Sequence, residues 1–168
     1  MAAKLAHPKP LNDPSGDLVE SLLNVSAFLL NKAGARVREH YEEALKPLGM
    51  HGRHLSLMVA IEEKGSLTQQ QMSRCLCTDR SSMVQLVDDL EKLGLVERLP
   101  VPDDRRAHAV ALTRKGREIL PEARRLGEAV EKEFLSCLPA AQRKDLMEGL
   151  RQLVLNHFTP EKPKEAKS

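Results

Sequence analysis

Two groups of side chains have the types and spacing for metal or thiol chemistry, and the first is a pair of histidines. His51 and His54 stand three residues apart, so a helix would place them on one face, with His40 nearby. A zinc site needs three or four ligands. The only carboxylates at hand from the preceding segment are Glu39, Glu42 and Glu43. The pattern therefore favours hydrogen-bonded or exposed histidines, and we expect no metal and no cofactor.

The second group is the pair Cys75 and Cys77, with one residue between them. Such thiols could form an oxidation switch that tilts the helix following them. However, cysteines this close are poorly placed for an unstrained disulfide, and a free cysteine is commonly a small buried hydrophobe. Cys75 and Cys77 stay redox candidates beside that structural alternative, and Cys137 is interpreted as a packing residue.

The chain lacks the residue patterns of the common enzyme classes. It has no glycine-rich phosphate loop, no nucleophile elbow, no Cys-x-x-Cys pair and no His-Glu-x-x-His run. Ser81 and Ser82 have no neighbouring base that would activate a hydroxyl. We therefore predict that the protein is not an enzyme.

Basic residues concentrate between Arg98 and Arg117. This segment holds six bases and two acids, a net charge of +4, whereas the whole chain carries +2. The six bases are Arg98, Arg105, Arg106, Arg114, Lys115 and Arg117. Basic groups on an exposed segment neutralise phosphates and release counterions, which favours a nucleic acid as partner.

Periodicity and stop signals predict the elements that position these residues. Apolar residues recur every three or four positions from Leu18 to Ala44, which predicts one long helix over 17–48, capped by Asp17. At about 45 Å it would exceed what a small domain needs, which indicates a partner subunit. Helices are also expected over about 52–63 and 79–93, with a short one opening at Thr68 between them. Two more follow, one after Gly116 and one after Pro139.

The period changes between the fourth and fifth of these helices. Residues 95–99 and 107–113 are expected to form two strands, joined by a turn over 100–104. The predicted fold is mainly α with a small β-wing, a winged helix-turn-helix of about six helices. The expected divisions are a flexible tail over 1–16, a dimerisation helix over 17–48, a DNA-binding region over 49–117, C-terminal dimerisation helices over 118–158 and a flexible tail over 159–168.

Composition narrows the class of protein. The chain has 168 residues and only four aromatic ones, Phe28, Tyr41, Phe134 and Phe158, which argues against a base-stacking platform for single-stranded nucleic acid. It has no apolar stretch of about 18 residues, and its first residues lack the apolar core of a secretory signal. We expect a cytoplasmic protein with reduced thiols and no membrane partner.

The chain resembles the multiple-antibiotic-resistance regulators, the MarR family, from Leu18 to Phe158. The specific part comprises Leu67-Thr68-Gln69, the run from Thr78 to Arg98 that includes Gly94-Leu95-Val96-Glu97-Arg98, then Asp103-Asp104-Arg105-Arg106 and Val110-Ala111-Leu112-Thr113. The resemblance implies a homodimeric transcription factor, usually a repressor. It also implies binding to pseudo-palindromic duplex DNA and release by a small molecule or an oxidant.

The resemblance further implies which residues contact DNA. The helix from about residue 79 would enter the major groove, with base contacts from Arg80, Ser81, Ser82 and Gln85. Asp79 is better interpreted as the cap of that helix. In the wing, Arg106 would reach a minor groove while Asp104 holds it in place, and Arg105 and His108 would lie near phosphates. Cys77 stands where relatives often carry glycine.

Effector binding is the least determined part of the prediction. By resemblance, a pocket would lie where the first, second and fifth helices meet. Arg36, His40, His51, Arg53 and His54 would make it cationic and suited to an anionic or aromatic molecule. Two alternatives stay open: a thiol- or metal-responsive version of the same regulator, and a winged-helix module that binds a protein partner without DNA.

Overall fold

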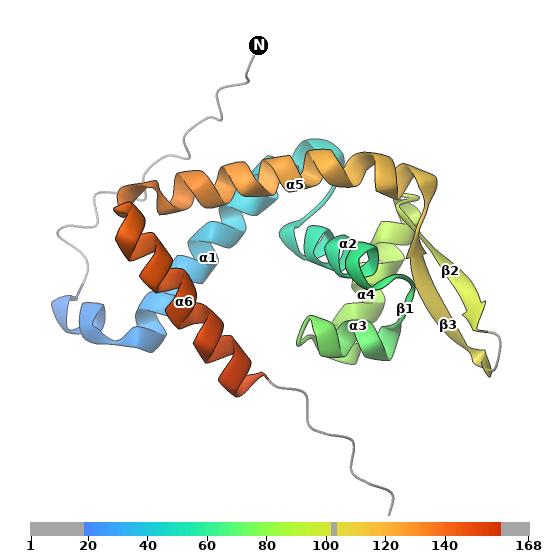
Figure 1. The fold of residues 1–168 in the computed structure, drawn as a ribbon, viewed down its shortest axis with the longest axis horizontal. Helices are drawn as coiled ribbons and strands as arrows, with labels where there is room; N and C mark the ends of the chain where they lie inside the picture. The colour runs from blue at the N-terminus through green and yellow to red at the C-terminus, as the bar shows by residue number, and fades with distance from the viewer. Residues whose placement is uncertain (1–18, 102–103, 159–168) are drawn as a thin grey trace, which may run out of the picture.

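The computed structural model describes residues 19–101 and 104–158, and side chains for all of these except 104–107. Figure 1 shows the long helix α5 (Arg114–Phe134) along one edge of the molecule. Helices α1 (Ser26–Leu45) and α6 (Ala140–His157) lie beneath one end of α5, and the smaller helices and the sheet lie beneath the other. The predicted fold, mainly α with a small wing, is confirmed.

The predicted single helix over 17–48 is wrong, because the structure breaks this segment at both ends. A 3-10 helix, η1 (Glu20–Asn24), is followed by Val25 in an extended conformation, and only then does α1 begin. Valine is stiff at χ1 and favours extended backbone, which suits it to this break. A second 3-10 helix, η2 (Lys46–Leu48), ends the segment at Gly49, whose φ of 67° allows the turn. The straight part is therefore about 30 Å long rather than 45 Å, and the expected cap Asp17 lies outside the described residues.

The helix-turn-helix forms as its capping signals predict. Helix α2 (Gly52–Lys64) leads to α3 (Gln69–Cys75), where the Thr68 hydroxyl accepts from the backbone N–H of Gln71 and the Gln71 side chain accepts from Thr68. This reciprocal pair satisfies two helix-end donors. Helix α4 (Arg80–Lys92) follows after a short turn.

The sheet has one strand more than the predicted two. Strands β2 (Val96–Val101) and β3 (Asp104–Leu112) form the wing hairpin, and β1 (Leu67–Thr68) pairs antiparallel with β3 on its other side. The strands also extend beyond the predicted bounds, so residues expected in the turn lie in strands. The short β1 ties the start of α3 to the wing.

The last two helices lie close to their predicted positions. Helix α5 begins at Arg114, capped by Thr113, so it starts earlier than the predicted point after Gly116. It continues through Pro121, which lacks the N–H that a helix interior uses. A 3-10 helix, η3 (Leu135–Cys137), and Pro139 then separate α5 from α6.

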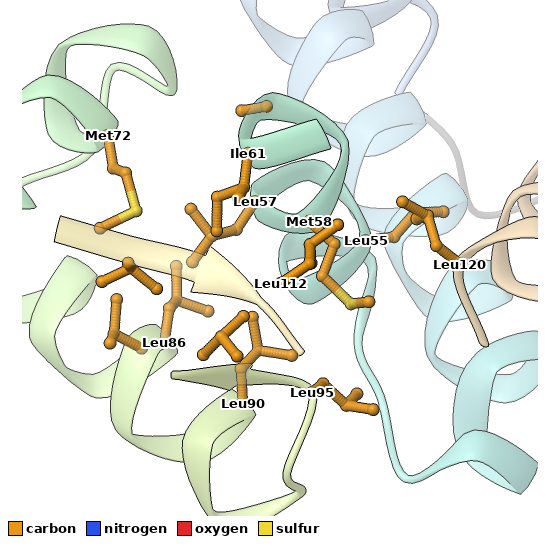
Figure 2. Close-up of a cluster of buried hydrophobic side chains, with 14 of the residues drawn as sticks. Leu55, Leu57, Met58, Ile61, Met72, Leu86, Leu90, Leu95, Leu112 and Leu120 are labelled. Carbon is orange, nitrogen blue, oxygen red and sulfur yellow. The ribbon is translucent and has the colours of Figure 1, made fainter. Parts of the chain in front are cut away.

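The hydrophobic core lies in the DNA-binding half predicted from the sequence. Figure 2 shows side chains from α2, α3 and α4 meeting those of the sheet and of α5. Its fully buried members include Leu57, Met58, Met72, Leu90 and Leu120. No residue of α6 is buried. The core therefore fixes α4 and the wing, while α6 is left with an uncovered surface.

Candidate nucleic-acid interface

Helix α4 begins at a strongly stabilised cap. The Asp79 carboxylate accepts from the backbone N–H of Ser82 at 2.9 Å and from the hydroxyl of Ser81 at 2.6 Å. These bonds, that of Ser81 first, hold the pKa of Asp79 well below its usual range. The prediction that Asp79 caps this helix is confirmed, and its exposed carboxylate is engaged by the first turn of α4.

The two faces of α4 differ sharply in character. Its buried side consists of Met83, Leu86, Val87 and Leu90. On the first two turns of the helix, Arg80, Ser81 and Gln85 are exposed and Ser82 is half-buried. The four predicted recognition residues are therefore all accessible. The amide nitrogen of Gln85 lies 3.4 Å from a carboxylate oxygen of Asp89, which leaves the amide oxygen of Gln85 free to accept.

The two cysteines predicted as redox candidates lie at the end of α3 and in the turn before α4. Cys75 and Cys77 are both exposed. Cys77 has a φ of 47°, in the left-handed region that glycine adopts at no steric cost. Its sulfur also lies 3.9 Å from the carbonyl oxygen of Phe158, at the end of α6. Cys137 is exposed too, so its interpretation as a packing residue is wrong for the chain described.

The wing places its predicted contact residues near the tip of the hairpin. Val101 pairs with Asp104, and the register shifts at Pro100, which pairs with His108. Arg105 and Arg106 thus follow directly on the first residues of β3, although the side chains of 104–107 lie outside the description. His108 is exposed. Strand β2 of this hairpin contacts α4.

Most of the basic residues counted in the wing segment are engaged within the protein. Arg98 forms ion pairs with Asp88 and Glu91 of α4. Lys115 donates to the carbonyl of Leu93 at 2.7 Å, and Arg117 donates to that of Leu112 at 2.6 Å. Arg114 lies 3.6 Å from Glu118. Local net charge therefore overstates what this segment offers to phosphates.

These internal contacts anchor α4, and sequence reasoning missed them. The Lys115 ammonium caps the C-terminal end of α4, where a positive charge is favoured, and the Thr113 hydroxyl donates to the carbonyl of Gly94 at 2.7 Å. The Glu-x-x-Gly-Leu-Val-Glu-Arg run contained the acid and the arginine of one such contact, Glu91 and Arg98. Their pairing depends on how the strand folds back on the helix, which spacing alone does not give.

The five residues predicted to form a cationic pocket lie at different places. Arg36 is paired with Glu39 at 2.7 Å, and His51 lies 3.6 Å from Glu42. The ring of His40 packs edge-on against Phe134. Arg53 is exposed on α2.

His54 is 2% exposed, and its Nδ1 accepts from the backbone N–H of His51 at 3.1 Å. Burial, with the neighbouring His51 charge, lowers the pKa of His54, so this ring is kept neutral. The five residues therefore do not form a common wall of positive charge.

A cleft of about 660 Å³ opens where α2 meets α1, α3 and α5. Of the predicted pocket residues it includes Arg53 alone. Its apolar lining comes from Tyr41, Leu55, Val59, Ala60 and Leu76, and its charged lining from Arg53, Lys64, Glu63 and Glu131. The Tyr41 hydroxyl donates to Glu131 at 3.0 Å, and burial followed by the Glu131 charge raises the pKa of Tyr41. Cys75 lines the same cleft.

Comparison with known proteins agrees with this geometry. The model of the MarR family matches residues 48–107, which span α2, α3, α4 and the wing. The HTH-type transcriptional regulator SarZ of Staphylococcus haemolyticus is 25% identical over 137 residues, covering 82% of this chain and 92% of SarZ. The chain belongs to the MarR family.

Two solved structures extend the similarity over the whole fold. CouR of Rhodococcus jostii RHA1, bound to p-coumaroyl-CoA, superposes with a TM-score of 0.71 at 26% identity, covering 86% of this chain and 99% of CouR. A cysteine-to-serine variant of MarR from E. coli, complexed with operator DNA, superposes with a TM-score of 0.70 at 25% identity, covering 76% and 92%. This MarR-family protein is therefore a transcriptional regulator, a class of proteins that are not enzymes.

Within residues 19–101 and 104–158, none of the helices combines the length and apolar character that a bilayer crossing requires. The same residues hold no group of three or more histidine, cysteine or acidic side chains placed to bind a metal.

Proposed function

We propose that this MarR-family regulator binds double-stranded DNA at an inverted-repeat operator, with α4 in the major groove and the β2–β3 wing at the adjacent minor groove. The observation that carries the proposal is the accessible start of α4, where Arg80, Ser81 and Gln85 are exposed while the apolar side of the helix is buried. Base edges in the major groove are recognised by such side chains. The similarity to a MarR protein complexed with operator DNA supports the same docking.

Each candidate residue has a role that fits its chemistry. Gln85 would pair with adenine and Arg80 with guanine, while Ser81 and Ser82 would contact phosphate or a base edge. In the wing, Arg106 would enter the minor groove with Asp104 holding its guanidinium. Arg105 and His108 would lie beside phosphates.

The regulator would act as a homodimer built from its terminal helices. Leu22, Leu23, Val25, Leu29 and Leu30 expose an apolar surface along η1 and the start of α1. The face of α6 does the same with Leu146, Met147, Leu153 and Val154. Covering these faces with a second copy removes apolar area from water and would place two α4 helices about 34 Å apart, one turn of DNA.

Binding would repress nearby genes until a small molecule releases the protein. The cleft at α2 suits a molecule with an apolar body, because apolar side chains dominate its wall. The similarity to CouR, which is solved with p-coumaroyl-CoA, supports a response to an organic ligand. The cleft is lined by two basic and two acidic residues, so its charges balance. It therefore favours an anion less than the predicted cationic pocket would.

A thiol-responsive version of the same regulator is favoured by one observation: Cys75 is exposed in the wall of this cleft. A thiol oxidant such as diamide would then weaken operator binding. A Cys75→Ser/Cys77→Ser variant should lose that response, and unchanged sensitivity of the variant would exclude these thiols as the sensor.

The test is capture of fragmented genomic DNA by the purified, reduced protein near physiological salt, followed by sequencing. We expect one inverted-repeat motif and a steep fall of affinity with salt. Diffuse capture without a motif would contradict sequence-specific binding, and affinity independent of salt would favour the protein-interaction module instead.

Two variants then test the assigned contacts. Gln85→Ala should relax sequence preference at one operator position, at a cost of about 1–3 kcal/mol on the operator. Arg106→Ala should weaken operator binding, whereas Arg125→Ala, which removes an exposed α5 arginine paired with Glu122, should not. Unchanged affinity of Arg106→Ala would exclude the wing contact.

A further inference from the structure

An ion cluster joins the wing to α4. The guanidinium of Arg98, on β2, bonds through Nη2 to an oxygen of Asp88 and through Nη1 to an oxygen of Glu91. The two acids are three residues apart on α4 and thus lie on one side of the helix. All three side chains are partly buried, with exposed fractions of 30%, 41% and 39%. One planar group therefore holds two points of the helix.

The strand itself directs Arg98 toward α4. Side chains alternate along β2, so Arg98 lies on the same side of the sheet as Val96, which is 2% exposed, while Glu97 and Leu99 are exposed on the other side. The partner of Arg98 on β3 is Val110, which is fully buried. Arg98 thus spans from the core-facing side of the wing to the helix.

We propose that Arg98 is a positioning residue that fixes the angle between α4 and the wing, and thereby sets sequence discrimination. The inference rests on the DNA-binding function proposed above. Helix and wing must enter neighbouring grooves of one duplex together, so an error in their relative angle removes base contacts from one of them. The apolar face of α4 holds the helix to the core but is not directional. A bidentate guanidinium supplies that direction.

The same geometry separates Arg98 from the phosphate-binding residues. Its charge faces two carboxylates, so the cluster carries a net charge of −1. Paired in this way, Arg98 neutralises little of the charge of a DNA phosphate. Neutralising Asp88 and Glu91 therefore distinguishes a purely electrostatic effect of the cluster on DNA affinity from a positioning effect on sequence discrimination.

The experiment measures the affinity of the full-length protein for its selected operator and for a scrambled duplex of equal length. The central variant is Asp88→Asn/Glu91→Gln, which keeps Arg98 and makes the surface more positive. Electrostatics alone would tighten binding to both duplexes equally. Positioning predicts a ratio of operator affinity to scrambled affinity about tenfold lower, comparable to one mismatched base pair.

Two further variants complete the test. Arg98→Lys keeps the charge but loses the planar fork, and it should lower the ratio with an unchanged salt slope. Arg124→Met removes an ion pair of similar exposure between α5 and Glu62 of α2, away from α4, and should leave the ratio unchanged. Thermal unfolding of each variant separates lost stability from lost discrimination, because a merely structural role would lower the melting temperature without changing the ratio.

Three results would overturn the proposal. An unchanged ratio in both Asp88→Asn/Glu91→Gln and Arg98→Lys would exclude positioning. An Arg98→Met variant whose salt slope falls by about one, with Arg98→Lys behaving as wild type, would assign Arg98 to a phosphate. Absence of any preferred duplex for the wild-type protein would instead contradict the DNA-binding function itself, and with it the role of Arg98.

Discussion

His54 shows how a single buried group makes stability depend on pH. Its Nδ1 accepts from the backbone N–H of His51, the cap residue of α2, so the ring stays neutral in the fold. Burial and the His51 charge lower its pKa, with Arg53 acting in the same direction and Asp89 and Glu42 opposing. A histidine in the unfolded chain takes up its proton near pH 6.5, before the folded one does. Stability is therefore complete above that pH and falls as the pH drops through it.

The variant His54→Gln tests this dependence. Glutamine cannot titrate, but its carbonyl can accept the same N–H, as Gln71 does at the start of α3. We expect urea unfolding to show a flatter stability profile between about pH 7 and pH 5 in this variant. His157→Gln, at an exposed position on α6, should keep the wild-type slope. Equal slopes in wild type and His54→Gln would contradict the assignment.

Cys77 stores strain that glycine would relieve. Its φ of 47° brings Cβ close to the backbone, at a cost of about 1–2 kcal/mol for a residue with a side chain. Part of the gain from glycine is lost to the greater freedom of the unfolded chain. Cys77→Gly should therefore raise the free energy of unfolding by up to about 1 kcal/mol.

Cys75→Gly is the matched control for this prediction, because Cys75 is the last residue of α3. Glycine should destabilise a helix there by about 1 kcal/mol. Two glycine variants with the same sign of effect on the denaturation midpoint would contradict the strain argument.

Among the elements, the start of α5 lies very close to Leu95, the residue before β2. A methyl group added at Gly116 would lie 2.0 Å from the carbonyl oxygen of Leu95, which is backbone and cannot rotate away. Gly116→Ala should therefore cost at least about 2 kcal/mol in urea unfolding. Gly34→Ala on α1, where nothing lies within 4 Å, should stabilise by about 0.5–1 kcal/mol. Equal effects of the two substitutions would refute the close approach.

Local signals predicted the elements where neighbouring residues decide the structure. Thr68 with Gln71 and Asp79 with Ser82 mark their helix starts because each cap is completed within three residues. Strand β1 could not be found in this way, since two residues become a strand only when β3 lies beside them. The break at Val25 was missed because the apolar period continues across it.

In the candidate site too, the features decided by neighbouring residues were predictable and those decided by distant contacts were not. The exposure of Ser81 and Gln85 follows from helical period, because they lie opposite the apolar stripe of α4, whereas Arg80 is exposed as the first residue of the helix. The ion cluster of Arg98 and the placement of the histidines depend on contacts between elements distant in sequence. Local composition counted Arg98 as a free base, whereas the fold pairs it with Asp88 and Glu91.

At the scale of the whole molecule, the uncovered face of α6 predicts the oligomeric state. Leu153 is 49% exposed within one chain. Leu153→Asp would place a carboxylate in the proposed interface, where burial without a partner costs at least about 3 kcal/mol. The dimer dissociation constant should therefore weaken more than about a hundredfold.

Sedimentation equilibrium measures this effect directly. Lys144→Asp introduces the same side chain about two and a half helical turns away, hence on the opposite side of α6, and should stay dimeric. A monomeric wild type at micromolar concentration, or dimers in all three proteins, would contradict the proposed interface.

Helix α5 also gives the molecule the mechanics of a lever. It runs unbroken from Arg114, beside the wing, to Phe134, at the end of α5 that lies over α1 and α6, over about 31 Å. At its N-terminal end, Thr113 and Lys115 donate hydrogen bonds to carbonyls at the end of α4. Near its C-terminal end, Glu131 lines the cleft. A tilt of about 5° at one end displaces the other by about 3 Å over this length. In the proposed dimer, a molecule bound in the cleft would thus need to rotate α5 only slightly to move the two α4 helices out of register with the operator.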